Sequence, residues 1–391
     1  MKLDWPKTKL KKHTVKIGSG ITPKGGEAVY KSSGIPLIRS QNVLVNRLDL
    51  SDVAYIEESQ HKKMSGSKVY SGDVLLNITG ASIGRSCVVP KEIGEANVNQ
   101  HVCIIRLKET LDARLLSTYL NSWFGQKQIW SFQSGGSREG INFQQIGSFD
   151  ILLPPLPEQK AIADILSTWD EAIEKTEKLI KEKEKEKDHL IYEIIIEPAL
   201  SGKWNEQLAG KLFKERRESN CNDLNLLSIT GNEGVIPRDE TNRKDSSNED
   251  KSKYLRICPG DIGYNTMRMW QGVSALSELE GIVSPAYTIV TPKKDLHPKF
   301  VAYLFKTPFM IHRFYRYSQG LTSDTWNLKF HHFAEVKIPF PPLSEQKSIA
   351  ETLNTAQDEI NILKKLSEKY KKQKQGLMQK LLTGEWRVRN V

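Results

Sequence analysis

The sequence lacks the features of membrane, secreted and zinc-ribbon proteins. No apolar run approaches the roughly 18 residues that a transmembrane helix needs, and the longest stretches are fragments such as residues 194–196. The basic N-terminus contains no apolar core, so no secretory signal is visible. The 4 cysteines are scattered and form no CxxC pair, which argues against a zinc ribbon, a redox motif and a disulfide framework. We therefore expect a cytoplasmic protein with reduced cysteines and no membrane partner.

Catalytic motifs are missing as well. The chain has no GxxxxGK[ST] phosphate loop, no HExxH metal pair and no GxSxG nucleophile turn. It has neither an Asp- or Asn-Pro-Pro-aromatic loop nor a glycine-rich loop after a strand that would hold S-adenosylmethionine. His331 and His332 form a pair without a third ligand, and we interpret them as structural. These absences favour a binding or adaptor protein without catalytic residues, metal or cofactor of its own.

Length and charge indicate several globular parts and an anionic partner. The 391 residues, 38% hydrophobic and 27% charged, predict a globular chain of two or three domains. The net charge is +10. It is +7 over residues 1–157, −5 over 158–200, +4 over 201–344 and +4 over 345–391. Two basic blocks, at 1–157 and 201–344, thus alternate with two segments whose net charges, −5 and +4, are opposite to each other.

These blocks follow an internal repeat. Residues 154–166 read PPLPEQKAIADIL and residues 341–353 read PPLSEQKSIAETL, at an offset of 187 residues. Each copy closes on a related signature, LSGKW at 200–204 and LTGEW at 382–386, so the first copy is longer by five residues. Fainter echoes place Asp73 and Asn77 opposite Asp261 and Asn265. The chain therefore repeats a globular unit followed by a helix, and the globular parts have diverged further than the helices.

Each repeated segment predicts a long helix. The first runs from Glu158 to about Ile196, and the second carries the same periodicity. The apolar stripes consist of Ile162, Leu166, Trp169, Ile173 and Ile180 in the first helix and Ile349, Leu353, Ile360, Leu363, Leu366, Tyr370, Leu377 and Leu381 in the second. Because the helices carry opposite net charge, we predict that they pair as an antiparallel coiled coil. The alternative is two independent helices that pack on their own domains.

The globular units are predicted to be mixed and β-rich, so the fold class is α+β with a pseudo-two-fold repeat. A turn that leads into a strand is expected at 69–78, with further strands at 97–107 and 282–290, short helices at 115–130 and 300–315, and a polar loop at 239–253. We expect globular domains at 1–157 and 204–342, and helical segments at 158–203 and 343–391.

Taken with the repeat, further motifs give the chain a family resemblance. In the first unit they are Gly34–Arg39, Gly72–Leu75, Ile83–Gly84 and Asn99–Val102, and in the second Pro259–Ile262 and Ile282–Tyr287. Together with the doubled PPL-x-EQ helix starts, they resemble the specificity subunit of type I restriction-modification enzymes over nearly the whole chain. The second unit departs from the pattern, because it lacks the glycine-rich opening found at residues 18–26.

The resemblance implies a division of labour. Each unit would be a target recognition domain that reads one half of a bipartite, asymmetric site on double-stranded DNA. The helices would set the spacing and dock two modification subunits, which bind S-adenosylmethionine and methylate adenine at N6. Two restriction subunits would add translocation and cleavage, with ATP and Mg bound there. The present chain would be non-catalytic and would bind no cofactor.

Base reading in the major groove favours Arg or Lys on guanine and Asn or Gln on adenine. Turn-rich stretches of both units supply such residues. The candidates in the first unit are Arg39, Gln41, Asn42, Thr79, Ser82, Arg85, Ser137, Arg138 and Asn142. Those in the second unit are Tyr264, Asn265, Arg268, Ser323, Trp326, Asn327 and Lys329. For each residue alone, a capping or surface role is the competing interpretation.

Two other functions remain open at this point. One is a hidden nuclease or methyltransferase activity, which would need a methyl-donor loop that we do not find. The other is a coiled-coil scaffold that binds protein without reading DNA sequence. The divergence of the two globular units argues against a scaffold, since two similar ends would serve it equally well. Neighbouring genes for a methyltransferase and a helicase-nuclease would favour the DNA-reading function.

Overall fold

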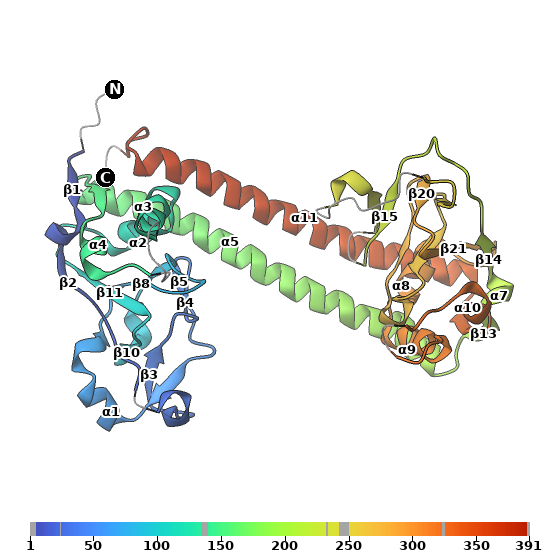
Figure 1. Cartoon of the computed structure of the whole chain (residues 1–391), viewed down its shortest axis with the longest axis horizontal. Coiled ribbons are helices and arrows are strands. Elements are labelled where there is room, and N and C mark those ends of the chain that lie inside the picture. The colour runs from blue at the N-terminus through green and yellow to red at the C-terminus, as the bar shows by residue number, and fades with distance from the viewer. Residues whose placement is uncertain are drawn as a thin grey trace. The chain divides into compact units, whose positions relative to one another are not determined.

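The computed structural model describes residues 5–23, 25–133, 140–231, 234–241, 250–322 and 325–388. The contacts of the chain divide it into two compact units. The first comprises residues 1–178 and 364–391, and the second comprises residues 179–363. Each unit thus contains one globular part and portions of both long helices (Figure 1). The finer division at residues 157, 203 and 342 follows the repeat and stays a prediction.

The first unit is built around a four-stranded antiparallel sheet. Its order is β2 (Thr14–Ser19), β11 (Val102–Leu107), β8 (Val74–Asn77) and β9 (Ser86–Val88). Alternate side chains point to opposite faces of a strand, and here both faces are buried. One face packs on helices through Val74, Leu76, Cys103 and Ile105, and the other packs on a second sheet through Leu75, Cys87, Val102 and Ile104. Burial raises the pKa of the Cys87 and Cys103 thiols to about 12.

The second sheet of this unit is mixed, because β3 and β10 run parallel. Its order is β6 (Ala54–Ile56), β3 (Ile35–Ile38), β10 (Ala96–Val98) and β7 (Lys68–Val69). The remaining elements are the pair β1 (Lys7–Lys9) and β12 (Asp150–Leu152), the hairpin β4 (Val43–Leu44) and β5 (Arg47–Leu48), and the helices α1 (Glu58–Lys63), α2 (Ala113–Asn121), α3 (Trp123–Gln133) and α4 (Phe143–Gly147). The expected strand at 97–107 is therefore two strands joined by a turn, and the expected helix at 115–130 is interrupted at Ser122.

The second unit repeats the central sheet. Its order is β14 (Phe213–Arg216), β21 (Tyr287–Pro292), β18 (Ile262–Asn265) and β19 (Ser274–Leu276). The register is also repeated, because Val290 faces Ile262 as Ile105 faces Val74. β14 occupies the place of β2 although the glycine-rich opening is missing, so the second unit keeps the scaffold without that motif.

The other elements of the second unit mostly have counterparts in the first. They are the pairs β13 (Asn205–Leu208) with β22 (Lys337–Phe340), β15 (Leu227–Ile229) with β16 (Val235–Pro237) and β17 (Leu255–Ile257) with β20 (Gly281–Val283), and the helices α7 (Ala209–Leu212), α8 (Pro298–Leu304), α9 (Pro308–Tyr317) and α10 (Phe330–Phe333). The expected helix at 300–315 is interrupted before Pro308, because proline fits the first turn of a helix and not its interior. Most of the polar loop at 239–253 lies outside the described residues.

The long helices are α5 (Leu156–Ile191) and α11 (Leu343–Leu382). α5 continues through a π-helical turn, η5 (Tyr192–Ile196), into α6 (Glu197–Leu200). Pro198 explains this turn, since its missing N–H and its ring prevent the regular bond to the residue four positions earlier. Helical backbone thus extends over residues 156–200 in the first copy and 343–382 in the second, which accounts for the five extra residues.

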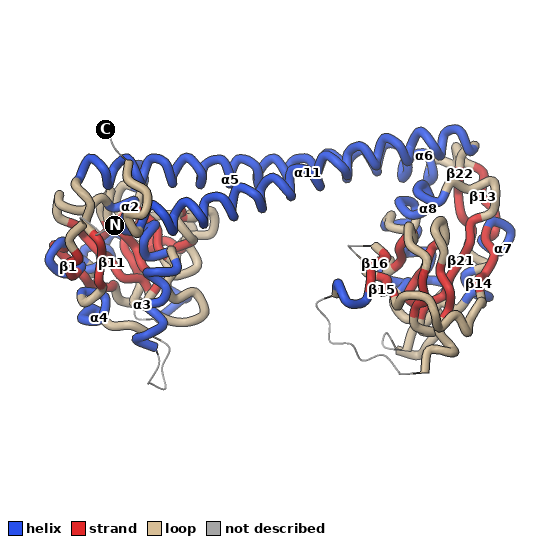
Figure 2. The backbone as a smooth tube through the Cα atoms, turned by 90° about the horizontal axis from the view of Figure 1, so that it is seen from above, coloured by secondary structure: helices blue, strands red, loops and turns tan. Residues whose placement is uncertain are grey.

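The two helices run antiparallel within each unit. In the first unit Trp169 packs edge-on against Tyr370 at 5.6 Å between ring centroids, and Asp170 forms an ion pair with Lys374. In the second unit Lys183 forms an ion pair with Glu359 at 3.3 Å, and the Lys187 ammonium donates to Gln357 at 2.8 Å. Partners on one helix descend in number as those on the other ascend, which confirms the predicted antiparallel pairing. Figure 2 shows the paired helices beside the strands of each unit.

The repeated EQ motif joins each long helix to its globular part. The buried Gln159 amide accepts from the Asp112 N–H at 2.8 Å and donates to the Thr110 and Pro154 carbonyl oxygens. Gln346 makes the same three bonds in the second unit, with the His297 N–H at 2.8 Å and the Asp295 and Pro341 carbonyl oxygens. Each glutamine thereby satisfies the N–H of the residue before α2 or α8 and ties that segment to the start of its own long helix.

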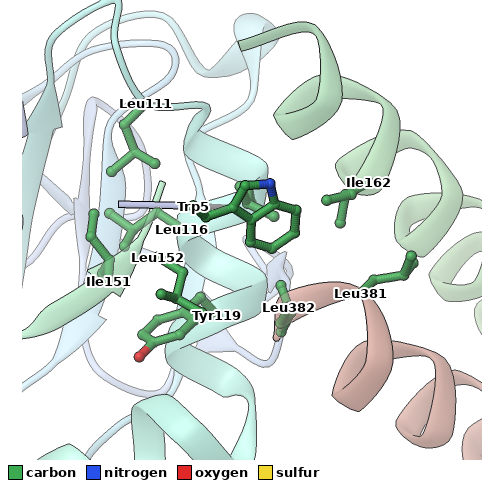
Figure 3. A pocket seen from close by; sticks show the side chains of 10 residues that line it. Trp5, Leu111, Leu116, Tyr119, Ile151, Leu152, Ile162, Leu381 and Leu382 are labelled. Carbon is green, nitrogen blue, oxygen red and sulfur yellow. The ribbon is translucent and has the colours of Figure 1, made fainter. Parts of the chain in front are cut away.

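The preceding glutamate and one tryptophan complete this junction. The Trp5 indole donates to Glu158 at 3.3 Å, and the Trp204 indole donates to Glu345 at 3.2 Å. Trp5 lies in a small apolar cavity between α2, α5 and the end of α11, beside Leu382 (Figure 3). Among the described residues, an arginine joins the first junction and not the second, because Arg387 donates to both Glu158 oxygens at 2.8 and 2.9 Å. Residues from both ends of the chain therefore close the first unit.

No helix in the described part of the chain has the length and apolarity needed to cross a membrane.

Candidate nucleic-acid interface

Several turns of the first unit meet where β8 ends. The buried Asn77 amide, the last residue of β8, donates to the Ser40 carbonyl oxygen at 2.8 Å and to the Ser82 hydroxyl at 3.1 Å. This one side chain therefore joins the turn after β3 to the turn between β8 and β9. The repeated asparagine is thus a scaffold residue in the first unit.

Two further segments join the same place. The Ile78 N–H donates to the His101 carbonyl oxygen, and the Ile141 N–H donates to the Ile78 carbonyl oxygen, both at 3.0 Å. Thr79 Oγ1 also lies 2.6 Å from His101 Nδ1. We call the resulting surface the first reading end, and it comprises residues 39–42, 78–86, 99–101 and 140–142. The structure thus brings together candidates that lie up to 103 residues apart in the sequence.

Within the turn after β3, the candidate residues have different roles. Asn42 is 2% exposed, and its amide donates to the Asp49 and Asp52 carbonyl oxygens at 2.9 and 3.0 Å. Its position therefore supports a structural role and not a DNA contact. Gln41 is exposed and donates to the Asp52 carboxylate at 2.9 Å, while Arg39 is half-buried with its guanidinium 5.6 Å from the Tyr30 ring centroid.

Among the later candidates, Arg85 is accessible. It is exposed, and its side chain has no partner among the described residues. Thr79 and Ser82 are half-buried and hold the turns together through His101 and Asn77. Asn142 and Gln145 form a reciprocal capping box at the start of α4. Capping is the interpretation that competed with DNA binding for this residue. Ser137 and Arg138 lie outside the described residues.

Sequence reasoning omitted the turn of Gln100 and His101 from the candidate residues. Gln100 is exposed, and its amide lies 3.3 Å from His101 Nε2. The turn separates β10 from β11 and faces the same surface as Thr79. The sequence does mark these residues, because they belong to the Asn99–Val102 motif. The strand expected at 97–107 includes that motif and therefore hides the turn.

The second unit assembles its turns by the same backbone bonds. The Thr266 N–H donates to the Ala286 carbonyl oxygen at 3.1 Å, and the Leu328 N–H donates to the Thr266 carbonyl oxygen at 2.8 Å. These bonds correspond to those around Ile78 in the first unit. Gln319 and Asn327 add a reciprocal pair of backbone bonds at 2.8 Å each. We call the surface of residues 265–273, 284–287, 319–322 and 325–328 the second reading end.

Several candidates of the second unit serve the scaffold. Tyr264 is fully buried in the core, and burial raises the pKa of its hydroxyl, so its position does not support the predicted DNA contact. Asn265 accepts from the Met267 N–H at 3.0 Å, and the Asn327 amide donates to the Gln319 and Thr325 carbonyl oxygens, both at 3.1 Å. Ser323 lies outside the described residues.

The accessible part of the second reading end is more aromatic than that of the first. Half-buried Trp326 packs edge-on against Trp270 and Tyr315, at 5.1 and 4.9 Å between ring centroids. Arg268 is exposed in the turn beside this cluster, and Lys329 is exposed just beyond it at the start of α10. Neither side chain has a partner among the described residues. The tryptophans therefore support a surface from which Arg268 projects.

The repeated aspartates hold the opposite ends of the strands. Asp73 and Asp261 are 3% and 1% exposed. Asp73 accepts two bonds from Arg106 at 2.8 Å, and Asp261 accepts from Arg216 at 2.7 and 3.3 Å. These hydrogen bonds raise the pKa of both guanidinium groups. The GD motif is thus structural, and its buried charges are paired as such charges must be.

The two reading ends offer side chains suited to recognition by contact. Their exposed tips carry arginine, lysine and amide donors, which match base edges and phosphates. In the described ranges, no group of three or more His, Cys, Asp or Glu side chains is placed to hold a metal ion.

Comparisons with known proteins agree with this geometry. The sequence model of the family described as "Type I restriction modification DNA specificity domain" matches twice, over residues 8–184 and 218–372. A putative type I restriction enzyme MjaX specificity subunit of Methanocaldococcus jannaschii is 23% identical over 409 aligned positions, covering 99% of this chain and 94% of that protein. The MjaVIII specificity subunit of the same organism is 26% identical over 277 positions, covering 62% of this chain and 63% of that subunit.

Solved structures show the same fold. The S subunit of a type I restriction-modification system from M. genitalium superposes with a TM-score of 0.61 at 14% identity, covering 97% of this chain and 96% of that subunit. A chain of a type I R-M system, from work on its complex assembly and conformational transition, gives a TM-score of 0.54 at 16% identity, with 98% of both chains covered. The α+β architecture with two repeated units is thereby confirmed.

Proposed function

Because the chain belongs to the family of type I restriction-modification DNA specificity subunits, we propose that it reads the DNA target of such a complex without catalysing a reaction. Each reading end contacts one half of a bipartite, asymmetric site on double-stranded DNA. The single observation that carries this proposal is the repeated junction of turns around Ile78 and Thr266, which presents different exposed side chains on one scaffold.

The partners follow from the same proposal. Two modification subunits dock on the paired helices, bind S-adenosylmethionine and methylate adenine at N6. Two restriction subunits bind ATP and Mg and carry out translocation and cleavage. The complex acts in the cytoplasm. The helices set the distance between the two half-sites, and the four-part division at residues 157, 203 and 342 describes these roles.

We assign base contacts to the candidates with free or accessible ends. Arg85 and Gln41 are the readers of the first reading end, with Gln100 added from the structure. Arg268 is the corresponding residue of the second reading end, where Trp326 supports the surface, and Lys329 lies directly after that surface. An arginine that bonds guanine in two places contributes roughly 1–3 kcal/mol of discrimination against a wrong base.

The test is a methylome. The chain is co-expressed with its modification subunit in a host without DNA methylation, and N6-methyladenine is mapped by sequencing. A split motif with one modified adenine in each half is expected. Arg85→Ala should relax one position of one half by roughly tenfold or more, and Arg268→Ala should relax the other half only. Conversion of exposed Val45 to Thr serves as a control that changes neither half.

Two results of the methylome experiment would contradict the proposal. Absence of methylation, with an active modification subunit that co-purifies, would favour the scaffold that binds protein without reading DNA. Methylation by the chain in the absence of its modification subunit would favour the hidden enzyme.

A further inference from the structure

Asn46 occupies an unusual position at the tip of the β4–β5 hairpin. Its φ angle is 56°, in the left-handed region that asparagine tolerates better than most residues. Neighbouring Val45 is 58% exposed, whereas the Asn46 side chain turns back into the protein and makes three hydrogen bonds. The left-handed backbone conformation of Asn46 therefore goes together with three side-chain hydrogen bonds.

These contacts join three elements. The Asn46 amide donates to the Asp170 carboxylate of α5 at 3.2 Å. Its carbonyl oxygen accepts from the Ser117 hydroxyl at 3.2 Å and from the Asn121 amide at 2.7 Å, both on α2. Asp170 in turn pairs with Lys374 of α11. One asparagine thus connects the hairpin to α2 and, through Asp170, to both long helices of the first unit.

The same hairpin is attached to the first reading end. The Asn46 N–H donates to the Ser86 carbonyl oxygen at 2.8 Å, directly after Arg85. At the base of the hairpin, the Asp49 N–H donates to the Asn42 carbonyl oxygen at 2.8 Å, next to Gln41. Both turns that carry proposed base readers are therefore continuous with the hairpin, and Asn46 is its direct side-chain link to α5 beside the Arg47–Glu174 ion pair at 3.4 Å.

The second unit links its hairpin to its reading end through different contacts. Lys306 stands at the place of Asn121 in the repeat, and its ammonium donates to the Gly231 and Gly272 carbonyl oxygens at 3.2 and 2.8 Å. These oxygens belong to the turns of the β15–β16 hairpin and the second reading end. The bond from an asparagine at the hairpin tip to a carboxylate on the long helix is thus a feature of the first unit.

We propose that Asn46 is a positioning residue that fixes the orientation of the first reading end against α5, and thereby the spacer length that the complex accepts. This inference rests on the proposed function. B-DNA makes one turn in about 10–10.5 base pairs, so one added base pair moves a half-site by about 3.4 Å and rotates it by about 34°. A reading end held rigidly by Asn46 cannot follow this displacement, whereas a loosened one can.

The main variants separate orientation from reading. Asn46→Gly keeps the left-handed backbone accessible and removes all three side-chain bonds. Asn46→Asp keeps the acceptor for Ser117 and Asn121 and places a carboxylate against Asp170. The double variant N46D/D170N restores a donor on α5 opposite the new carboxylate. Asn220→Gly is the matched control, because Asn220 is the other described non-glycine residue with a positive φ, at 62°, and it lies in the second unit.

The readout is methylation by the full chain with its modification subunit, on plasmids whose half-sites are separated by the native spacer or by one base pair more or less. We expect Asn46→Gly and Asn46→Asp to lower the preference for the native spacer by roughly tenfold, since a hydrogen bond to a charged group is lost. The bases read in each half stay unchanged. N46D/D170N should recover most of the preference, and N220G should match the wild type.

Wild-type spacer preference in both single variants would overturn the proposal. So would a change in the bases of one half at unchanged spacer preference, because Asn46 would then shape the reading surface alone. If Asn46→Gly does not fold, Ser117→Ala removes one donor to Asn46 and is expected to give a smaller relaxation of the same kind. Failure of the proposed function is distinguishable, because the wild-type chain would then show no split motif at all.

Discussion

The two reading ends share their supports and differ in what they expose. Both are held by the same pair of backbone bonds, around Ile78 in the first unit and Thr266 in the second. The first then presents Arg85 and polar turns, while the second presents Arg268 beside a cluster of Trp270, Trp326 and Tyr315. Residues that hold the scaffold are therefore repeated along the chain, and residues at the tips are not. This is the pattern expected when one fold carries two different binding surfaces.

The junctions that join the globular parts to α5 and α11 are alike in one residue and different in another. Gln159 and Gln346 make equivalent sets of three hydrogen bonds. The glutamates before them differ, because Glu158 accepts two bonds from Arg387 and Glu345 pairs with no arginine among the described residues. The first junction includes both ends of the chain, whereas the second lies within it. The added ion pair thus distinguishes the first junction from the second.

The largest effect should come from removing the buried glutamines. Gln159→Ala and Gln346→Ala each leave three backbone groups without partners, at a cost of about 3 kcal/mol in the free energy of unfolding. The two losses should be equal if the junctions are equivalent. Hydrogen exchange followed by mass spectrometry would show lost protection at the start of α2 for the first variant and at the start of α8 for the second.

Exposed Gln144 provides the control for these two variants. Gln144→Ala should leave protection unchanged in both units. Unequal losses for Gln159→Ala and Gln346→Ala, or loss of protection in the opposite unit, would contradict the equivalence of the junctions.

A smaller effect is expected from replacing Glu158 or Glu345. The two replacements should differ in how the free energy of unfolding changes with pH. Hydrogen bonds from Arg387 are the main cause that lowers the pKa of Glu158 below its ordinary value of 4.5. A lowered folded pKa contributes stability that is present above about pH 4.5 and is lost as the pH falls through the folded pKa. Glu158→Gln should therefore lower the free energy of unfolding by about 2 kcal/mol at pH 7 and flatten its decline in acid.

Glu345→Gln is the matched variant at the other junction. It keeps an acceptor for the Trp204 indole and removes no ion pair with arginine, so its loss at pH 7 should be smaller than that of Glu158→Gln. Denaturant unfolding between pH 3 and 7 measures both. Equal losses and equal slopes would show that Arg387 contributes nothing specific.

The repeat made most of the fold predictable from sequence. The apolar stripes predicted both helices, and the doubled PPL-x-EQ starts predicted two equivalent units. Prediction failed where a single polar or proline residue interrupts a pattern. Ser122 and Pro308 divide two expected helices, and the turns at residues 99–101 and 284–286 divide two expected strands. Apolar periodicity continues across such interruptions, so it gives no sign of them.

The candidate site was predictable in location and less so in detail. Sequence reasoning selected the turns that the structure brings together. It could not distinguish Arg85, which is exposed, from Asn42 and Asn142, which bond the backbone of their own turns. Asparagine serves equally well as a base reader, a cap or a turn residue, and only the fold decides between these roles. Tyr264 is polar enough to fit the base-reader pattern, but its strand position places it in the core.

The central claim is that each unit reads one half of the target independently. The most direct measurement replaces residues 1–157 with the corresponding part of another member of the family and maps N6-methyladenine with the same modification subunit. The account predicts that one half of the split motif changes completely while the other half stays the same. A change in both halves, or in neither, would contradict it.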